Sequence, residues 1–466
     1  MLTFFPNKIV SKYFYVYLGT LAVVSFIFMR YAMNFEYMLL GAIWVGGFMF
    51  GSSYCTRKWA NIDKDIYIRR VFWIAVGLRF VWVIISYFYY KSETGIPFEF
   101  SAADSIGYHG DGEWLATQKF DVVRRYLIEG KGISDSGYLF YLTYLYKIIG
   151  PNIFLTRVIK CFISAFTCIL LYKLSRRSMG ESVGRMVGIF AMLFPNLIFY
   201  CGLHLKETEM LFLMVAYIER ADNLLRERNF KWWNIVLVAL LAISLFSFRT
   251  VLGAVAVFSF ISALVFAPTK IVSKGRRAIL IGWIVLAIMV LAGGTIATEI
   301  EDVWSSRSEN QTAKRASQTV RGNKWAQYAT GTVMAPLMFA LPFPTMVDVD
   351  YQYTQQMLSG GNFVKNCLSM FVVIALYLVF FVKKNWRNFA LIGSFEVGYL
   401  GVICMSGFAN AERFLLPGVP MILVMAAYGL ANLDAKRYQW VKLWYWIVPV
   451  IAFGWAFFKL GSRGLF

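Results

Sequence analysis

Residues 71–90 read VFWIAVGLRFVWVIISYFYY, a continuous apolar stretch in which Arg79 is the one charged residue. About twenty apolar residues in a helix are enough to cross the hydrocarbon core of a bilayer. The stretch ends in Tyr89 and Tyr90, whose amphipathic rings favour the headgroup region. The segment therefore predicts a transmembrane helix.

The same pattern recurs along the 466 residues of the chain, which is 59% hydrophobic and 15% charged, with a mean hydropathy of +0.58. No ordinary soluble domain has this composition. Further apolar stretches occur at 13–29, 35–54, 152–172, 186–203, 208–219, 233–248, 251–267, 278–298, 364–382, 389–407, 414–432 and 443–458. We therefore predict an all-α polytopic membrane protein with about thirteen transmembrane helices.

Lys and Arg residues alternate with the predicted helices. The basic connections contain Arg57, Lys58, Lys64, Arg69 and Arg70; Lys173, Arg176, Arg177 and Arg185; Arg220, Arg226, Arg228 and Lys231; Lys270, Lys274, Arg276 and Arg277; Lys383, Lys384 and Arg387; and Lys436, Arg437 and Lys442. The intervening turns carry isolated basic residues, so the positive-inside rule places the N-terminus in the cytoplasm. Because the basic residues lie in short loops, the net charge of +20 does not indicate nucleic-acid binding.

This orientation leaves two long segments on the outer side, 91–151 and 299–363. The apolar piece at 332–347 is interrupted by Pro336, Pro342 and Pro344, so we predict that it is re-entrant or interfacial. The chain then divides into four parts. Residues 1–70 form two additional N-terminal helices and a cytoplasmic loop, and residues 71–298 form a transmembrane core. Residues 299–363 are an outer segment, and residues 364–466 form the C-terminal helices. Any chemistry is expected at the outer face.

The first outer segment contains an amphipathic pattern. The apolar residues Ala116, Phe120, Val123 and Leu127 recur at helical spacing, and basic residues lie between them. This pattern predicts a juxtamembrane helix that lies on the membrane surface.

Asp104 lies before that predicted helix in the sequence, and Tyr108 and His109 come four and five residues after Asp104. A carboxylate and hydrogen-bonding groups are thereby brought near the bilayer. The alternative is structural: Asp104 is the N-cap of a helix that begins near Ser105.

More ionisable residues lie at the predicted outer ends of later helices, namely His204, Lys206, Glu207 and Glu209 in one turn, Arg249 in another, and Glu412 and Arg413 in a third. Charges beside apolar helices tend to pair or to line a cavity, which indicates a functional site. The alternative, favoured for Lys206, is snorkelling to the headgroups. Arg79 and Glu396 lie deeper, either as a structural pair or as part of a pathway.

This combination of residues suits an anionic lipid substrate. A carboxylate can take a proton from an acceptor hydroxyl, while guanidinium groups bind a phosphate bidentately. A polyprenyl phosphate departs as a stable anion, so one base and phosphate-binding cations are sufficient.

Four stretches resemble the GT-C superfamily of membrane glycosyltransferases, which includes the protein O-mannosyltransferase and aminoarabinose transferase families. They are VFWIAVGLRFVWVIISYF leading to Asp104 and Tyr108, GPNIFLTRVIKCFISAFTCILLYKLSRRSMG, MLFPNLIFYCGLHLKE and ERFLLPGVPMILVMAAYGL. The resemblance implies that Asp104 is the catalytic acidic residue, that Glu207 is a second acidic element and that Arg413 faces the lipid phosphate. Two features depart from the family pattern. Additional helices precede residue 71, and Asp104 is followed by Ser105, whereas the O-mannosyltransferases have paired acids at this place.

We therefore expect a glycosyltransferase that moves a sugar from a polyprenyl-phosphate donor to a glycan, lipid or protein acceptor, at the extracytoplasmic face of a bacterial plasma membrane. Asp104 and Glu207 are the candidate catalytic residues. The candidate substrate-binding residues are Tyr108, His109, His204, Lys206, Arg249 and Arg413. No cofactor is predicted and no metal-ligand cluster stands out, and the six cysteines form no CxxC pair. The alternatives are a polymerase or ligase using polyprenyl-diphosphate glycans, a lipid-linked sugar transporter or flippase, and a noncatalytic assembly subunit.

Overall fold

The computed structural model describes residues 3–130, 133–226, 232–268, 339–349, 352–405 and 412–461, and a few positions between 273 and 282. Every named element in these ranges is a helix, and the β feature among them is a single bridge between Ala32 and Val347. The prediction of an all-α protein is confirmed.

Seven described helices are long and apolar enough to cross a membrane. They are α1 (Asn7–Ile27), α2 (Phe35–Lys58), α3 (Lys64–Thr94), α7 (Ile153–Met179), α17 with its π-helical end (Ser359–Val382), the segment Glu412–Ala431 that contains α19 (Glu412–Leu415) and α20 (Val419–Ala431), and α21 (Ala435–Gly461). A bent pair of helices adds an eighth candidate. It consists of α8 (Glu181–Leu193) and the segment Pro195–Gly202, which begins with α9 (Pro195–Phe199), and the two parts meet at 51°. These helices make the chain a multi-pass membrane protein.

The predicted number of thirteen spans stays a prediction. The helices α11 (Trp232–Phe248) and α12 (Thr250–Phe266) are apolar but shorter, and α18 (Ala390–Met405) is shorter still. The helix α10 (Glu207–Arg226) buries several acidic residues along its length. The predicted stretch 278–298 lies almost wholly outside the described residues.

The helix that contains the opening apolar stretch extends beyond it at both ends. The side chain of Asp63 accepts hydrogen bonds from the backbone N–H groups of Asp65 and Ile66, at 2.8 and 3.3 Å, and so caps α3. Gly95 ends α3 with a φ of 77°, a left-handed conformation that glycine adopts without a Cβ clash.

Arg79 has a structural role in this fold. Pro195 begins a new helix at the bend after α8, which leaves the last carbonyl groups of α8 without helical donors. The Arg79 guanidinium donates to the carbonyl oxygens of Ala191 and Met192, each at 3.1 Å, and to the Ser164 hydroxyl at 2.7 Å. Arg79 therefore caps the broken helix, and its described partners do not include Glu396.

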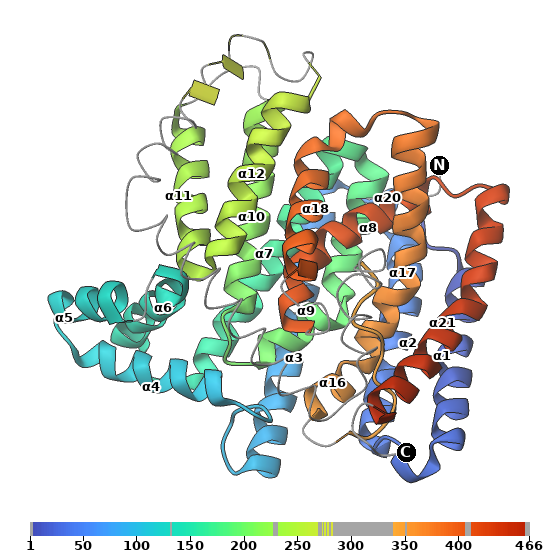
Figure 1. Cartoon of the computed structure of the whole chain (residues 1–466), viewed down its shortest axis with the longest axis horizontal. Helices are drawn as coiled ribbons and strands as arrows, with labels where there is room; N and C mark the ends of the chain where they lie inside the picture. The colour runs from blue at the N-terminus through green and yellow to red at the C-terminus, as the bar shows by residue number, and fades with distance from the viewer. Residues whose placement is uncertain are drawn as a thin grey trace.

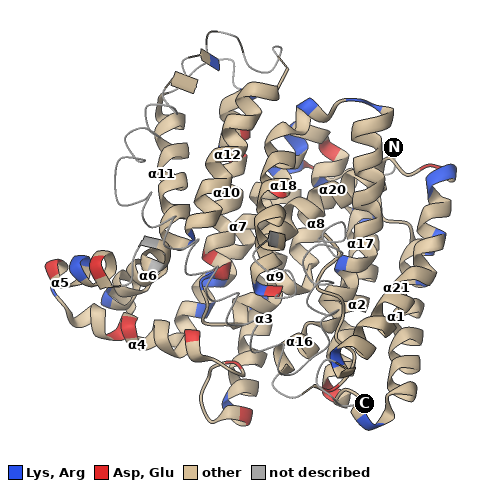
Figure 2. Cartoon of the chain, in the orientation of Figure 1, with Lys and Arg blue, Asp and Glu red and all other residues tan. Residues whose placement is uncertain are grey.

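The connections predicted to share a side contact one another. Arg185 donates to the carbonyl oxygens of Trp59 and Ile62, at 2.9 and 2.8 Å. Arg226 likewise reaches the Asn388 carbonyl at 3.0 Å. All three contacts join predicted cytoplasmic connections, and Figure 2 shows Lys and Arg along the end of the bundle where the N-terminus lies.

The two N-terminal helices complete one side of the bundle. Figure 1 shows α1 and α2 beside α21 and α17, on the side away from α11 and α12. Their buried residues, including Tyr13, Tyr17 and Phe48, belong to the same hydrophobic core as the later helices.

The first outer segment folds as three α-helices, α4 (Ala103–Thr117), α5 (Phe120–Arg125) and α6 (Ile133–Ile149), which project from the side of the bundle (Figure 1). The single surface helix expected from the apolar spacing is therefore interrupted, at Gln118 and Lys119. Val123 and Leu127 do face inward, against Leu115 and Leu139, whereas Phe120 is exposed. The sequence analysis missed α6, because Ser134, Asp135, Ser136 and Lys147 interrupt its 17 residues and leave no continuous apolar stretch of spanning length.

Of the proline-interrupted piece 332–347, the structure describes residues 339–347, which contain no helix and are largely buried. Asn366 of α17 donates to the carbonyl oxygen of Ala340 at 2.8 Å, and Lys365 donates to that of Leu341. These contacts satisfy backbone groups of an irregular segment that is buried in the protein. The re-entrant or interfacial placement of the piece stays a prediction.

Candidate functional site

Four of the predicted site residues meet at one end of the bundle, although they come from distant parts of the chain. The Nη1 of Arg413 donates to Oδ2 of Asp104, and its Nε donates to Oε1 of Glu207. The Nη2 of Arg249 lies 3.8 Å from the same Glu207 oxygen. Two carboxylates and two guanidinium groups therefore form one cluster, which we call the charged cluster.

The charged cluster extends from the surface into the interior. The side chain of Asp104 is 59% exposed, that of Arg413 is 25% exposed, and that of Glu207 is 0% exposed. Asp104 lies in the first turn of α4, whose N-cap position is Ala102 without a side-chain cap bond. The alternative interpretation of Asp104 as an N-cap is therefore wrong, and its carboxylate is available to solvent and to Arg413.

Arg249 is held from two further directions. Its Nη1 lies 3.4 Å from the Tyr399 hydroxyl, and its guanidinium stacks 4.9 Å above the Phe414 ring. Tyr399 in turn donates to the carbonyl oxygen of Phe414 at 2.8 Å. These contacts connect the charged cluster to α18 and to the residue that follows Arg413.

A buried polar network lies behind the charged cluster. The carboxylate of Glu412 accepts hydrogen bonds from the amides of Asn196 and Asn362, the latter at 3.4 Å. Lys365 lies one turn further along α17 from Asn362. The sequence analysis missed Asn196, Asn362 and Lys365, although amide and ammonium groups inside apolar stretches were a signal that could have found them.

The two histidines of the chain are joined by a tyrosine. The Tyr146 hydroxyl lies 2.9 Å from Nδ1 of His109 and 3.1 Å from Nε2 of His204. Burial lowers the pKa of both histidines; Lys160 and Arg157 lower that of His204 further, whereas Glu113 opposes the shift at His109. Tyr146 lies on α6 and was not predicted. This chain of three residues forms a second link between α4 and the turn before Glu207.

Lys206 and Tyr108 make other described contacts. Lys206 is buried and donates to the carbonyl oxygen of Phe248 at 2.8 Å, which joins the start of α10 to the end of α11. Because the Lys206 side chain is buried and bonded to protein, it does not snorkel to the headgroups in this structure. Tyr108 packs edge-on against the Tyr138 ring, with centroids 5.0 Å apart.

Among the residues that the structure describes, no group of three or more His, Cys, Asp or Glu side chains is placed to hold a metal ion.

The fold and the cluster define a multi-pass helical membrane protein with a charged site at one end of its bundle. Comparisons with protein-family models, with curated proteins and with solved structures find no match to this chain.

Proposed function

We propose that the protein is a glycosyltransferase that moves a sugar from a polyprenyl-phosphate donor to a glycan, lipid or protein acceptor, at the extracytoplasmic membrane face. The observation that supports this proposal best is the meeting of Asp104, Glu207, Arg249 and Arg413. All four lie in connections that the positive-inside rule assigns to the outer side.

Asp104 is the proposed base. It is the exposed carboxylate of the charged cluster, within reach of an acceptor from solvent, and it contacts the Arg413 guanidinium. The acceptor oxygen forms a bond to the anomeric carbon while the bond from that carbon to the phosphate oxygen breaks. The hydroxyl proton goes to Asp104, and the polyprenyl phosphate leaves as an anion, with inversion at the sugar.

The arginines are the proposed phosphate ligands. The donor phosphate replaces Asp104 as the partner of Nη1 of Arg413, which frees the carboxylate for the acceptor. Glu207, which is fully buried, keeps its contacts with Arg413 and Arg249 and holds both guanidinium groups in position. Glu207 is therefore assigned as a positioning residue.

The test uses purified protein in proteoliposomes, with a panel of radiolabelled short-chain polyprenyl-phosphate sugars and a membrane extract as the source of acceptor. Release of polyprenyl phosphate is measured. We expect Asp104→Asn to bind donor but to lose at least roughly 100-fold in rate, as for the loss of a general base. Asp121→Asn is the matched control, because Asp121 lies at the start of α5 in the same outer segment and should leave the rate unchanged.

Normal turnover by Asp104→Asn would remove Asp104 from the mechanism. Turnover of polyprenyl-diphosphate glycans alone would favour the polymerase or ligase. Movement of the labelled lipid across the bilayer without any release would favour the flippase.

A further inference from the structure

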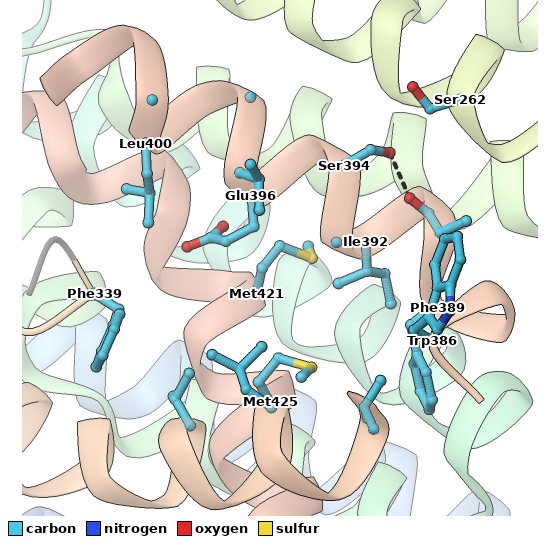
Figure 3. Close-up of a pocket in the computed structure, with 18 of the residues that line it drawn as sticks. Ser262, Phe339, Trp386, Phe389, Ile392, Ser394, Glu396, Leu400, Met421 and Met425 are labelled. Carbon is cyan, nitrogen blue, oxygen red and sulfur yellow. Dashed lines mark hydrogen bonds between the residues drawn. The ribbon is translucent and has the colours of Figure 1, made fainter. Parts of the chain in front are cut away.

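A cavity of about 780 Å³ lies between α12, α17, α18 and α20 (Figure 3). Its walls are almost entirely apolar, with residues such as Ile392, Met421 and Met425. Its volume lies within the range of roughly 300–1,000 Å³ that is typical of ligand pockets.

This cavity opens on the side of the helix bundle. Phe258, Phe266 and Phe380 line it, and each of these side chains is also more than half exposed on the described surface. They belong to helices that are predicted to cross the bilayer, so the cavity opens toward the hydrocarbon region. A ligand would therefore enter from the membrane, and its body must be apolar.

Glu396 is the carboxylic acid among the residues that line the cavity. Figure 3 shows its carboxyl group among Leu400, Met421 and Phe339. Both carboxyl oxygens are buried, and neither has a hydrogen-bond partner among the described residues. The Ser394 hydroxyl, by contrast, donates to the backbone carbonyl oxygens of Ala390 and Ser259.

A buried carboxyl group without a hydrogen-bond partner is unfavourable, so its presence in an apolar wall needs an explanation. A ligand group that pairs with it supplies one. An ammonium group would bring a second charge into the hydrocarbon region, at a large desolvation cost. A hydroxyl group is neutral and both donates and accepts, so it pairs with the carboxyl in either protonation state.

We propose that the cavity binds an apolar membrane alcohol, a hydrocarbon or isoprenoid body with one hydroxyl group, and that this hydroxyl pairs with Glu396. The site goes beyond the proposed sugar transfer and does not depend on it.

The site contacts the charged cluster through two elements. Tyr399, which hydrogen-bonds to Arg249, follows Glu396 by three residues on α18. The carboxyl also lies against Gly418, where an added Cβ would be 3.1 Å from Oε1 of Glu396. Gly418 belongs to the short segment that carries Arg413, so an occupant of the cavity touches the same elements that position the arginines.

The test is photolabelling of the full-length protein in nanodiscs with a short isoprenoid alcohol that carries a diazirine. We expect the label on residues of α12, α17, α18 and α20. The unlabelled alcohol should compete at least roughly ten-fold better than the same chain ending in a methyl group, because only the alcohol pairs with Glu396.

Variants separate the carboxyl from the cavity. Glu396→Leu should abolish the preference for the alcohol over the hydrocarbon, whereas Glu396→Gln should keep it, because an amide also donates and accepts. Ser262→Phe, which fills part of the cavity, should reduce labelling with Glu396 intact. Leu240→Phe, on the exposed face of α11, is the matched control and should change nothing.

Equal competition by alcohol and hydrocarbon in the wild-type protein would overturn the proposal. Labelling only at residues that do not line the cavity would also overturn it, as would an alcohol preference that survives Glu396→Leu. If Glu396→Leu does not fold, the wild-type competition and the Ser262→Phe result still decide the question.

Discussion

Arg413 joins Asp104 to Glu207 through two different nitrogens of one guanidinium group, so a residue near the C-terminal end of the chain connects α4 to α10. The geometry requires a planar fork, because Nη1 and Nε donate to two separate carboxylates. Asp104 and Arg413 are 309 residues apart in sequence.

We expect Arg413→Lys to lose both transfer and the docking of α4. An ammonium on a flexible chain cannot reproduce the two directed hydrogen bonds, so the rate in the polyprenyl-phosphate assay should fall by roughly 10- to 100-fold. Limited proteolysis should show faster cleavage in the outer segment 91–151. Arg220→Lys, a half-exposed arginine on α10, is the control. Unchanged turnover by Arg413→Lys would contradict the bridging role.

Glu207→Ala should destabilise the protein by about 3–5 kcal/mol, because it removes one partner of a buried ion pair. The double variant Glu207→Ala with Arg413→Ala should cost less than the sum of the two single changes. The midpoint of thermal unfolding in detergent reports both. Additive effects would show that Glu207 and Arg413 do not depend on each other, and Glu113→Ala, an exposed acid on α4, should have little effect.

Stability is expected to decrease as the pH falls from about 7.5 to 5. Burial holds the pKa of His204 in the folded protein well below its ordinary value of 6.5, which applies in the unfolded chain. At any pH between the folded pKa and the unfolded pKa, the unfolded chain therefore binds more protons than the folded protein. Stability therefore rises with pH in this window, by up to ~1.4 kcal/mol per pH unit for one histidine. Thermal midpoints measured across the window give the slope.

His204→Gln should flatten that slope. His109→Gln should flatten it less, because His109 is only partly buried and Glu113 opposes the shift of its pKa. A slope that both variants leave unchanged would assign the pH dependence to other groups.

Glu396→Leu should stabilise the protein in the absence of ligand, by about 1–3 kcal/mol, because it removes a buried carboxyl without a described partner from an apolar wall. The unfolding midpoint in detergent should therefore rise. A lower midpoint would show that the carboxyl has a stabilising partner.

The sequence carries much of the fold. Apolar runs such as 71–90 predict helices because a bilayer satisfies only backbone that bonds to itself, and alternating Lys and Arg predict which connections share a side. The contact of Arg185 with Trp59 and Ile62 agrees with that grouping. Helix α6 could not be predicted by this rule, because Asp135 and Lys147 lie among its 17 residues and interrupt the apolar pattern. It packs on α4 and α11 instead.

The sequence by itself also selected Asp104, Glu207, Arg249 and Arg413, because charged residues at apolar helix ends are costly and therefore informative. Only the tertiary structure decided that one arginine bridges the two carboxylates, that Tyr146 joins the two histidines, and that Arg79 caps a broken helix. The physical reason is that composition reports the cost of placing a charge beside a membrane, whereas the partner that offsets this cost depends on which distant helices pack together.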